Sequence, residues 1–254
     1  MGNETSQKEL DSIKDLVCSE VDARASMLIE ASHAIHENPE LNFEEHFAHE
    51  LLTGILEDEG LNPTRKAYDL ETAFEAQVGA DGPSVAVLCE YDALPDIGHA
   101  CGHNIIATAG LGAGLAAATV AEQMGGSLRI LGTPAEEGGG GKVFMGDRGA
   151  FENVDAALMV HPASGDLVKM NTIAIHRLQV EFEGEAAHAA ASPHRGKNAL
   201  DAAVLGYQNV AALRQHIRPD ERIHGIFTDA GRKPNIVPEF SSMEWYVRSK
   251  NIKT

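Results

Sequence analysis

Residues 85–89 read Val-Ala-Val-Leu-Cys, a short and wholly apolar run that is typical of a strand buried on both faces of a parallel sheet. Two further apolar runs follow, Leu-Arg-Ile-Leu at 128–131 and Ala-Ala-Leu-Met-Val at 156–160. The segments between them, residues 104–123 and 142–150, are each expected to form a helix. This alternation of strands and helices predicts an α/β domain with a doubly wound, mainly parallel sheet and right-handed crossovers.

The residues before this core are expected to be mostly helical. Apolar side chains recur at helical spacing from Leu10 to Ile35, which predicts one long amphipathic helix that ends near Asn38-Pro39. Residues 43–56 are expected to form a second helix, and residues 72–78 a strand.

The pattern changes near Asn171, where alternating apolar and polar residues indicate strands with one solvated face. The expected elements are strands at 173–182, 223–227 and 240–247 and an amphipathic helix at 199–216. We therefore predict two domains, an α/β domain over residues 1–170 and an α+β module over residues 171–254.

The composition excludes several classes of partner. The 254 residues contain 20 Lys plus Arg against 38 Asp plus Glu, and the resulting net charge of −18 disfavours nucleic acid and anionic membrane surfaces. The first 16 residues are polar and charged, and no apolar run reaches membrane-spanning length, so neither a signal peptide nor a membrane span is expected. Three cysteines do not suggest a disulfide framework. A cytoplasmic protein is expected.

The stretch His-Ala-Cys-Gly-His-Asn at residues 99–104 contains the strongest chemical signal. It places Cys101 and His103 two residues apart just before a helix, and a thiolate with an imidazole suits a borderline-soft divalent metal. Standing alone, such a pair is more often a buried cysteine beside an ordinary turn histidine.

Other residues that can bind metal follow the apolar runs: Asp92 after the first, Glu136 and Glu137 after the second, and His161 after the third. Taken singly, adjacent glutamates usually form a solvated turn and a lone histidine is usually a core or surface residue. In parallel sheets, however, ligands bind beyond the carboxyl ends of the strands. The shared edge favours a metal-dependent hydrolytic site, in which one glutamate binds metal, its neighbour is the general base and Asp92 orients a ligand.

Five motifs occur in order: His36-Glu-Asn-Pro-Glu-Leu41, Glu90-Tyr-Asp-Ala-Leu-Pro95, His99-Ala-Cys-Gly-His-Asn104, Gly132-Thr-Pro-Ala-Glu-Glu137 and His161-Pro162. Together they resemble the amidohydrolase branch of the aminoacylase and carboxypeptidase metallopeptidase family, over about residues 33–248. Within that branch, Asn104 together with residues 89–95 and 233–238 is similar to the Xaa-Arg (β-alanyl-lysine) dipeptidases.

The resemblance implies a catalytic domain that holds two divalent ions, zinc or manganese, and an inserted lid domain through which homodimers form. By position, the metal ligands correspond to Cys101, His103, Glu137 and His161, and the general base to Glu136.

The resemblance also points to residues of the second domain. His188 corresponds to a lid histidine that, in relatives, reaches the site of the other protomer and helps to polarise the scissile carbonyl. Without the family match, an exposed loop histidine would be an equally good interpretation. Asn235 and Arg248 are expected to help hold the substrate carboxylate.

The resemblance ends before the family pattern does. Relatives continue past Tyr246-Val-Arg248 with the rest of the lid, further catalytic-domain elements and a final metal-binding histidine, whereas this sequence stops at Thr254. We therefore expect both domains to be incomplete at the C-terminus and the chain by itself to show little dipeptidase activity.

Three functions account for parts of this pattern. The leading hypothesis is metal-dependent hydrolysis of dipeptide or N-acyl amino acid amide bonds, with dipeptides that end in a basic residue as substrates. The alternative is a catalytically inactive truncated form that binds metal weakly or dimerises as an interaction protein. A thiol hydrolase that uses Cys101 with His103 is disfavoured, because residues two apart in a turn rarely form a nucleophile and base and the glutamates would have no role.

Overall fold

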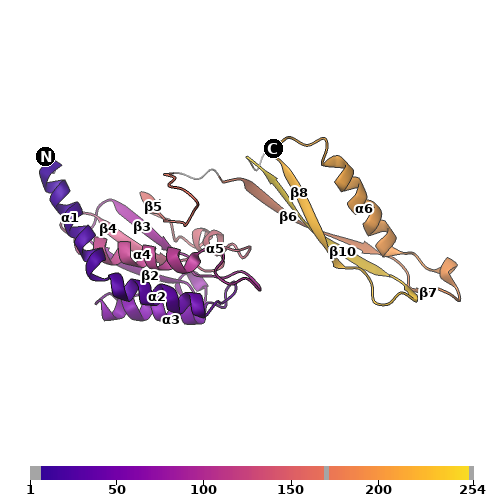
Figure 1. Cartoon of the computed structure of the whole chain (residues 1–254), viewed down its shortest axis with the longest axis horizontal. Helices are drawn as coiled ribbons and strands as arrows, with labels where there is room; N and C mark the ends of the chain where they lie inside the picture. The colour runs from indigo at the N-terminus through magenta and orange to yellow at the C-terminus, as the bar shows by residue number, and fades with distance from the viewer. Residues whose placement is uncertain (1–6, 169–171, 252–254) are drawn as a thin grey trace. The chain divides into compact units, whose positions relative to one another are not determined.

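The computed structural model describes residues 7–168 and 172–251. The chain forms two compact units, residues 1–165 and 166–254, and each is described by itself (Figure 1). The domain boundary predicted at residue 171 lies outside the described residues. Within the described part of the chain, no helix combines the length and the apolar character needed to cross a membrane.

Unit 1 is built on a five-stranded sheet with the order β1-β2-β4-β3-β5. Its strands are β1 Thr64–Arg65, β2 Phe74–Gly79, β3 Ser84–Cys89, β4 Ser127–Gly132 and β5 Ala156–Leu158. Strands β4, β3 and β5 are parallel, as the three apolar runs predict, and β2 and β1 extend the sheet in antiparallel orientation. The sheet is therefore mixed, and its parallel part holds the strands that end in metal-capable residues.

The helices of unit 1 are α1 Gln7–Ala23, α2 Ala25–Glu37, α3 His46–Asp58, α4 His103–Ala118 and α5 Gly141–Asp147, with a short 3-10 turn η1 at Ala67–Asp69. The prediction of one helix from Leu10 to Ile35 is wrong, because the chain leaves helical geometry at Arg24 (φ −99°, ψ 2°). The Arg24 guanidinium donates to the Glu20 carbonyl at 2.9 Å and to the Glu59 carboxylate at 2.9 Å, which ties the break to the end of α3.

Side chains of the strands alternate between the two faces of the sheet, and each face packs against its own apolar cluster. Ala86 and Leu131 face a cluster that includes Met145 of α5, whereas Cys89 and Ile130 face the larger core formed with α2, α3 and α4. No residue of β3 is exposed, so the prediction of a strand buried on both faces is confirmed. The edge strand β5 is exposed throughout and is two residues shorter than its apolar run.

Unit 2 contains a three-stranded antiparallel sheet with the order β6-β10-β8. Its elements are β6 Ala174–Glu183, β7 Ala187–His188, η2 Pro193–Arg195, α6 Ala199–Leu213, β8 Arg222–Asp229, β9 Ile236–Val237 and β10 Phe240–Ser249. Helix α6 packs on the sheet through Ala203, Met243 and Trp245, which are at most 3% exposed. These elements agree with the predicted α+β pattern, and β7 pairs with β9 as a separate two-stranded ribbon.

Candidate metal centre

The carboxyl ends of the parallel strands bring several metal-capable side chains to one edge of unit 1. Glu90 and Asp92 follow β3, Glu136 and Glu137 follow β4, His161 follows β5, and Cys101 and His103 lie at the start of α4. Gly102 makes the tight entry into α4 with φ +77°, and a Cβ built at this position would lie 2.9 Å from Pro162. The Cys101-to-His103 turn therefore packs directly against the segment that carries His161.

His103 lies at the centre of this cluster and is 1% exposed. Its Nδ1–H donates to Asp92 at 3.0 Å, which turns Nε2 toward the other carboxylates. Nε2 lies 3.6 Å from Glu90, 3.7 Å from Glu137 and 3.8 Å from Glu136, and it has no hydrogen-bond partner among the described residues. An unpartnered buried nitrogen facing three carboxylates is the arrangement that a cation would satisfy.

The pKa of His103 is affected by the negative charge of the surrounding carboxylates. Burial alone would lower the pKa, but the hydrogen bond to Asp92 and the charges of Asp92, Glu90 and Glu137 raise it overall. The same negative charge would attract a divalent cation.

Asp92 supports two neighbours at once. One carboxylate oxygen accepts from His103 and the other accepts from the backbone N–H of Glu137 at 2.8 Å. Burial opposes ionisation of Asp92, but the hydrogen bonds from His103 and from the Glu137 backbone outweigh burial and lower its pKa. With both oxygens occupied, Asp92 orients His103 and positions Glu137.

Cys101 also contacts Glu137. The thiol donates to the Glu137 carboxylate, and this hydrogen bond together with burial raises the pKa of Cys101 to about 11. The thiol is therefore protonated near neutral pH in the metal-free chain. A metal bound through this sulfur would displace that proton, because the thiolate is the ligand form.

His161 is exposed, and one of its ring nitrogens forms a hydrogen bond. Its Nδ1–H donates to the Pro162 carbonyl at 2.8 Å, which leaves Nε2 available. Ligand atoms of Glu90, His103 and His161 all lie within 4.8 Å of one another, and so do those of His103, Glu136 and Glu137. Cys101 belongs to neither group and contacts the cluster through Glu137. Nitrogen and carboxylate donors at this spacing fit zinc or manganese.

Glu136 remains on the accessible side of the cluster, with 46% of its side chain exposed. Partial burial and the nearby charges of Glu90 and Glu137 raise its pKa. A raised pKa makes this carboxylate a stronger base than an ordinary glutamate.

Sequence analysis missed two glutamates that the structure places at this centre. Glu90, directly after the buried strand β3, is 2% exposed and forms an ion pair with Lys142. Its position immediately after an apolar run could have identified it, because a charged residue there lies at the edge of the sheet where the strand ends. Glu45, within a segment that was interpreted only as the start of a helix, is fully buried.

Glu45 holds the turn that precedes Glu136. One Glu45 oxygen accepts from the backbone N–H of Ala135 at 2.8 Å and from that of Phe43 at 3.0 Å, and the other accepts from the Thr72 hydroxyl at 2.7 Å. Ala135 adopts φ +57°, a left-handed conformation that is unfavourable for a residue with a Cβ. The buried carboxylate therefore stabilises a strained backbone at the entrance to the two site glutamates.

In unit 2, the structure brings His188 and Asn235 together. His188 pairs with Ile236 across β7 and β9, and the Asn235 carbonyl accepts from the Ala189 N–H at 3.0 Å. The His188 Nδ1 accepts from the backbone N–H groups of Ala190 and Ala191 at 3.2 and 3.1 Å. Its proton is consequently on Nε2, so His188 can act as an N–H donor through that nitrogen.

Arg248 lies near the end of β10, whereas Asn235 lies beside β9 and close to the start of β10, so the two residues are far apart within a single copy of unit 2. Arg248 lies eight positions along β10 from Phe240, roughly 26 Å at about 3.3 Å per residue. Arg248 instead donates to His224 at 3.2 Å and lies over the Tyr246 ring.

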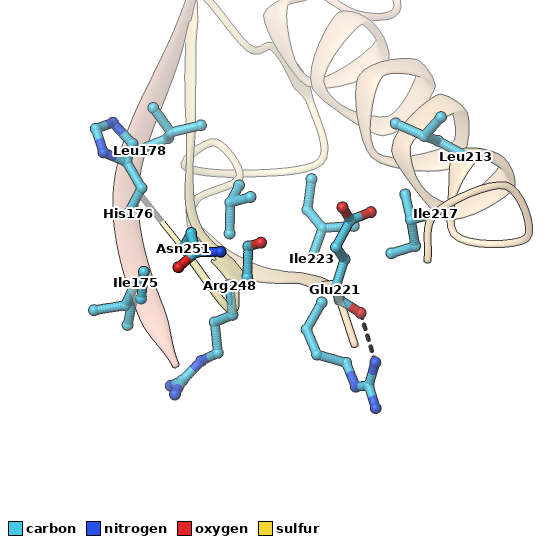
Figure 2. A pocket seen from close by; sticks show the side chains of 13 residues that line it. Ile175, His176, Leu178, Leu213, Ile217, Glu221, Ile223, Arg248 and Asn251 are labelled. Carbon is cyan, nitrogen blue, oxygen red and sulfur yellow. Dashed lines mark hydrogen bonds between the residues drawn. The ribbon is translucent and has the colours of Figure 1, made fainter. Parts of the chain in front are cut away.

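Arg248 also lines a pocket of about 390 Å³ at its own end of unit 2 (Figure 2). The pocket lies between the end of α6 and the sheet, and its lining includes Leu178, Leu213, Ile217 and Ile223. These apolar walls contrast with the carboxylates of unit 1, so this pocket is chemically distinct from the candidate metal centre.

Known proteins match both the sequence and the fold. The family model described as peptidase family M20/M25/M40 matches residues 86–232. The chain is 43% identical to Xaa-Arg dipeptidase of Mus musculus over 98% of its length and 40% identical to that of Homo sapiens over 99%. It is 36% identical to a p-aminobenzoyl-glutamate hydrolase polypeptide of Escherichia coli over 90%. The chain spans 61% of each Xaa-Arg dipeptidase and 52% of the hydrolase polypeptide.

Two solved structures illustrate the likeness in fold. An aminobenzoyl-glutamate utilization protein from Klebsiella pneumoniae aligns with a TM-score of 0.71 at 21% identity, over 93% of this chain and 70% of that one. A dinuclear metal binding peptidase of the M20 family from Bacillus subtilis aligns with a TM-score of 0.65 at 23% identity, over 91% and 66%.

Proposed function

Because this chain belongs to the peptidase family M20/M25/M40, we propose that it acts in metal-dependent hydrolysis of the amide bond of dipeptides whose C-terminal residue is basic. The observation that carries the proposal is the convergence on one point of the unpartnered His103 Nε2 and three carboxylates. The chain spans 61% of the dipeptidases it matches, and the activity is proposed for the protein to which these residues belong.

Cys101, His103, Glu137 and His161 would hold two divalent ions, zinc or manganese. His103 and His161 each donate Nδ1–H to an oxygen, which fixes the tautomer that presents Nε2 to the ions. When bound, such ions lower the pKa of a water molecule and polarise a carbonyl. Asp92 fixes the position of His103 relative to Glu137, because it accepts a hydrogen bond from each of them.

Glu136 would be the general base. It is the more exposed of the two adjacent glutamates, at 46% against 21% for the Glu137 side chain, so it can meet the attacking water from the solvent side. Its carboxylate would accept the proton of that water and return it to the leaving amine.

His188 would donate its Nε2–H to the scissile carbonyl. Two backbone donors on Nδ1 hold the ring in the required tautomer before substrate arrives. The proposal makes unit 2 a lid through which two chains pair, with His188 serving the site of the other protomer. Asn235, beside His188, and Arg248, at the far end of β10, would then bind substrate carboxylates at different sites of the homodimer.

The substrate preference rests on the relatives and on charge. Two relatives at 43% and 40% identity carry the name Xaa-Arg dipeptidase. The net charge of −18 favours approach of a cationic substrate.

The test uses the full-length natural protein that contains these residues and compares it with its Glu136→Gln variant. Both are supplied with zinc or manganese and with β-alanyl-lysine. We expect equal metal content and a loss of turnover of roughly two to four orders of magnitude in the variant, because an amide cannot accept the water proton. Near-normal turnover in the variant would assign the base to another residue. A wild-type protein that binds metal yet hydrolyses no dipeptide would contradict the proposed activity.

A further inference from the structure

We propose that Glu90 is an additional ligand of the metal centre and that Lys142 competes with the metal for it. The inference rests on the metal-binding part of the proposed function. It concerns two residues outside the ligand set that the family resemblance implies.

The first argument is the state of the Glu90 carboxylate. Glu90 is 2% exposed, and its Oε2 has no hydrogen-bond partner in the described part of the chain. A buried carboxylate oxygen without a partner is costly. The distance of 3.6 Å to the His103 Nε2 is too long for a hydrogen bond, so a proton on His103 does not satisfy this oxygen.

The second argument is geometric. Glu90, His103 and His161 each offer a ligand atom, and the three atoms lie within 4.8 Å of one another. Two of these residues, Glu90 and His103, aim unpartnered buried atoms at the shared space. A cation placed there would satisfy both atoms at once, and a carboxylate beside two imidazoles is a donor set suited to zinc or manganese.

The third argument concerns the other oxygen of the same carboxylate. Lys142, in the first turn of α5, forms an ion pair with Glu90 Oε1. In the metal-free chain this ammonium offsets part of the charge of Glu90, Asp92, Glu136 and Glu137. A divalent ion bound to Oε2 would be repelled by the Lys142 ammonium, because both cations would be neutralised by the same Glu90 carboxylate. Glu90 should therefore strengthen metal binding and Lys142 should weaken it.

Opposite effects of the two partners provide the test. The dissociation constants of Zn²⁺ and Mn²⁺ are measured on the same protein as in the test of the proposed function, by competition with a chromogenic chelator and without substrate. For Glu90→Gln, which keeps shape but removes the charge, we expect the dissociation constant to rise by about 10- to 100-fold. For Lys142→Met we expect it to fall by at least about threefold, because the competing charge is gone.

Matched variants control for charge and burial. Glu75→Gln removes a half-buried carboxylate that is paired with Arg129 outside the cluster, and Lys66→Met removes an ammonium that is paired with Glu71 on the surface. Both should leave the dissociation constants within about twofold of wild type, since charges outside the cluster are screened by solvent and salt.

A purely structural ion pair predicts a different outcome. If Glu90 only anchors Lys142, both site variants should weaken metal binding together or leave it unchanged, and either result would overturn the inference. Should Glu90→Gln fail to fold, Lys142→Met alone decides, because unchanged or weaker binding contradicts competition. If wild type and Glu90→Gln bind metal equally well, this inference fails while the proposed function stands. A wild-type chain that binds neither metal would also remove the proposed function.

Discussion

At the scale of single residues, the candidate centre depends on which atom of each side chain is already occupied. His103 and His161 each use Nδ1 to donate to an oxygen, and Asp92 uses both of its oxygens. The identity and order of the metal-capable residues could be predicted from their places after apolar strands. Which atoms of these side chains form hydrogen bonds could not be predicted, because the partners include backbone groups such as the Glu137 N–H and the Pro162 carbonyl.

Replacing Cys101 by serine should lower metal affinity by about tenfold or more, because a thiolate is exchanged for a poor hydroxyl ligand. Metal content after dialysis against limiting zinc measures the effect. Cys18→Ser is the matched control, since Cys18 is exposed on α1, and it should retain wild-type metal content. Equal metal content in the two variants would show that Cys101 is only a packing residue.

Glu45 supplies a prediction about pH. Burial raises the pKa of Glu45, so folding favours its protonated form. The stability linked to that form is fully present below the unfolded-state pKa of about 4.3 and is lost as pH rises through the folded-state pKa. Relative to Glu45→Gln, wild type should therefore lose free energy of unfolding as the pH rises above the unfolded-state pKa, as measured by urea titration. A difference that grows in favour of wild type with rising pH would contradict this assignment.

At the scale of elements, the strands and most helices followed from periodicity, and the departures have local causes. Strand β2 pairs with β4 in antiparallel orientation. This orientation could not be predicted, because it depends on the neighbouring strand and not on the residue pattern within β2. The predicted long helix breaks at Arg24, whose side chain donates to Glu59 at the C-terminal end of α3, a contact 35 residues away in sequence. Glu45 could not be assigned for the same reason, since its partner Ala135 lies 90 residues away.

The entry into α4 is the element most sensitive to substitution. Gly102→Ala places a Cβ at φ +77° and 2.9 Å from Pro162, so it should cost about 1–2 kcal/mol and weaken metal binding by shifting Cys101 and His103. Gly54→Ala is the control: Gly54 lies inside α3 with no atom within 4 Å of a built Cβ. That variant should gain roughly 0.4–1 kcal/mol and keep wild-type metal affinity. Urea unfolding and zinc titration measure both, and a Gly102→Ala chain as stable and as metal-competent as wild type would show that the turn tolerates a side chain.

At the scale of the whole molecule, the candidate metal centre and His188 belong to separate compact units. The prediction of a second module came from the change of pattern near residue 171, and the structure divides the chain between residues 165 and 166. The opposite placement of Asn235 and Arg248 was not predictable, because it follows from the length of β10 between them and from the ribbon that β9 forms with β7.

The separation of the units leads to a prediction with two independent probes. All ligand candidates lie in unit 1, whereas the single tryptophan, Trp245, is buried in the core of unit 2. A metal at 100 times its dissociation constant should stabilise the state that binds it by about 2.7 kcal/mol. In calorimetry, the transition of unit 1 should therefore move to higher temperature on addition of zinc, while the midpoint followed by Trp245 fluorescence should stay constant. The Cys101→Ser variant should lose most of the calorimetric shift and keep the fluorescence midpoint. Equal shifts in both probes would mean that the two units unfold as one, or that the metal binds outside the cluster of unit 1.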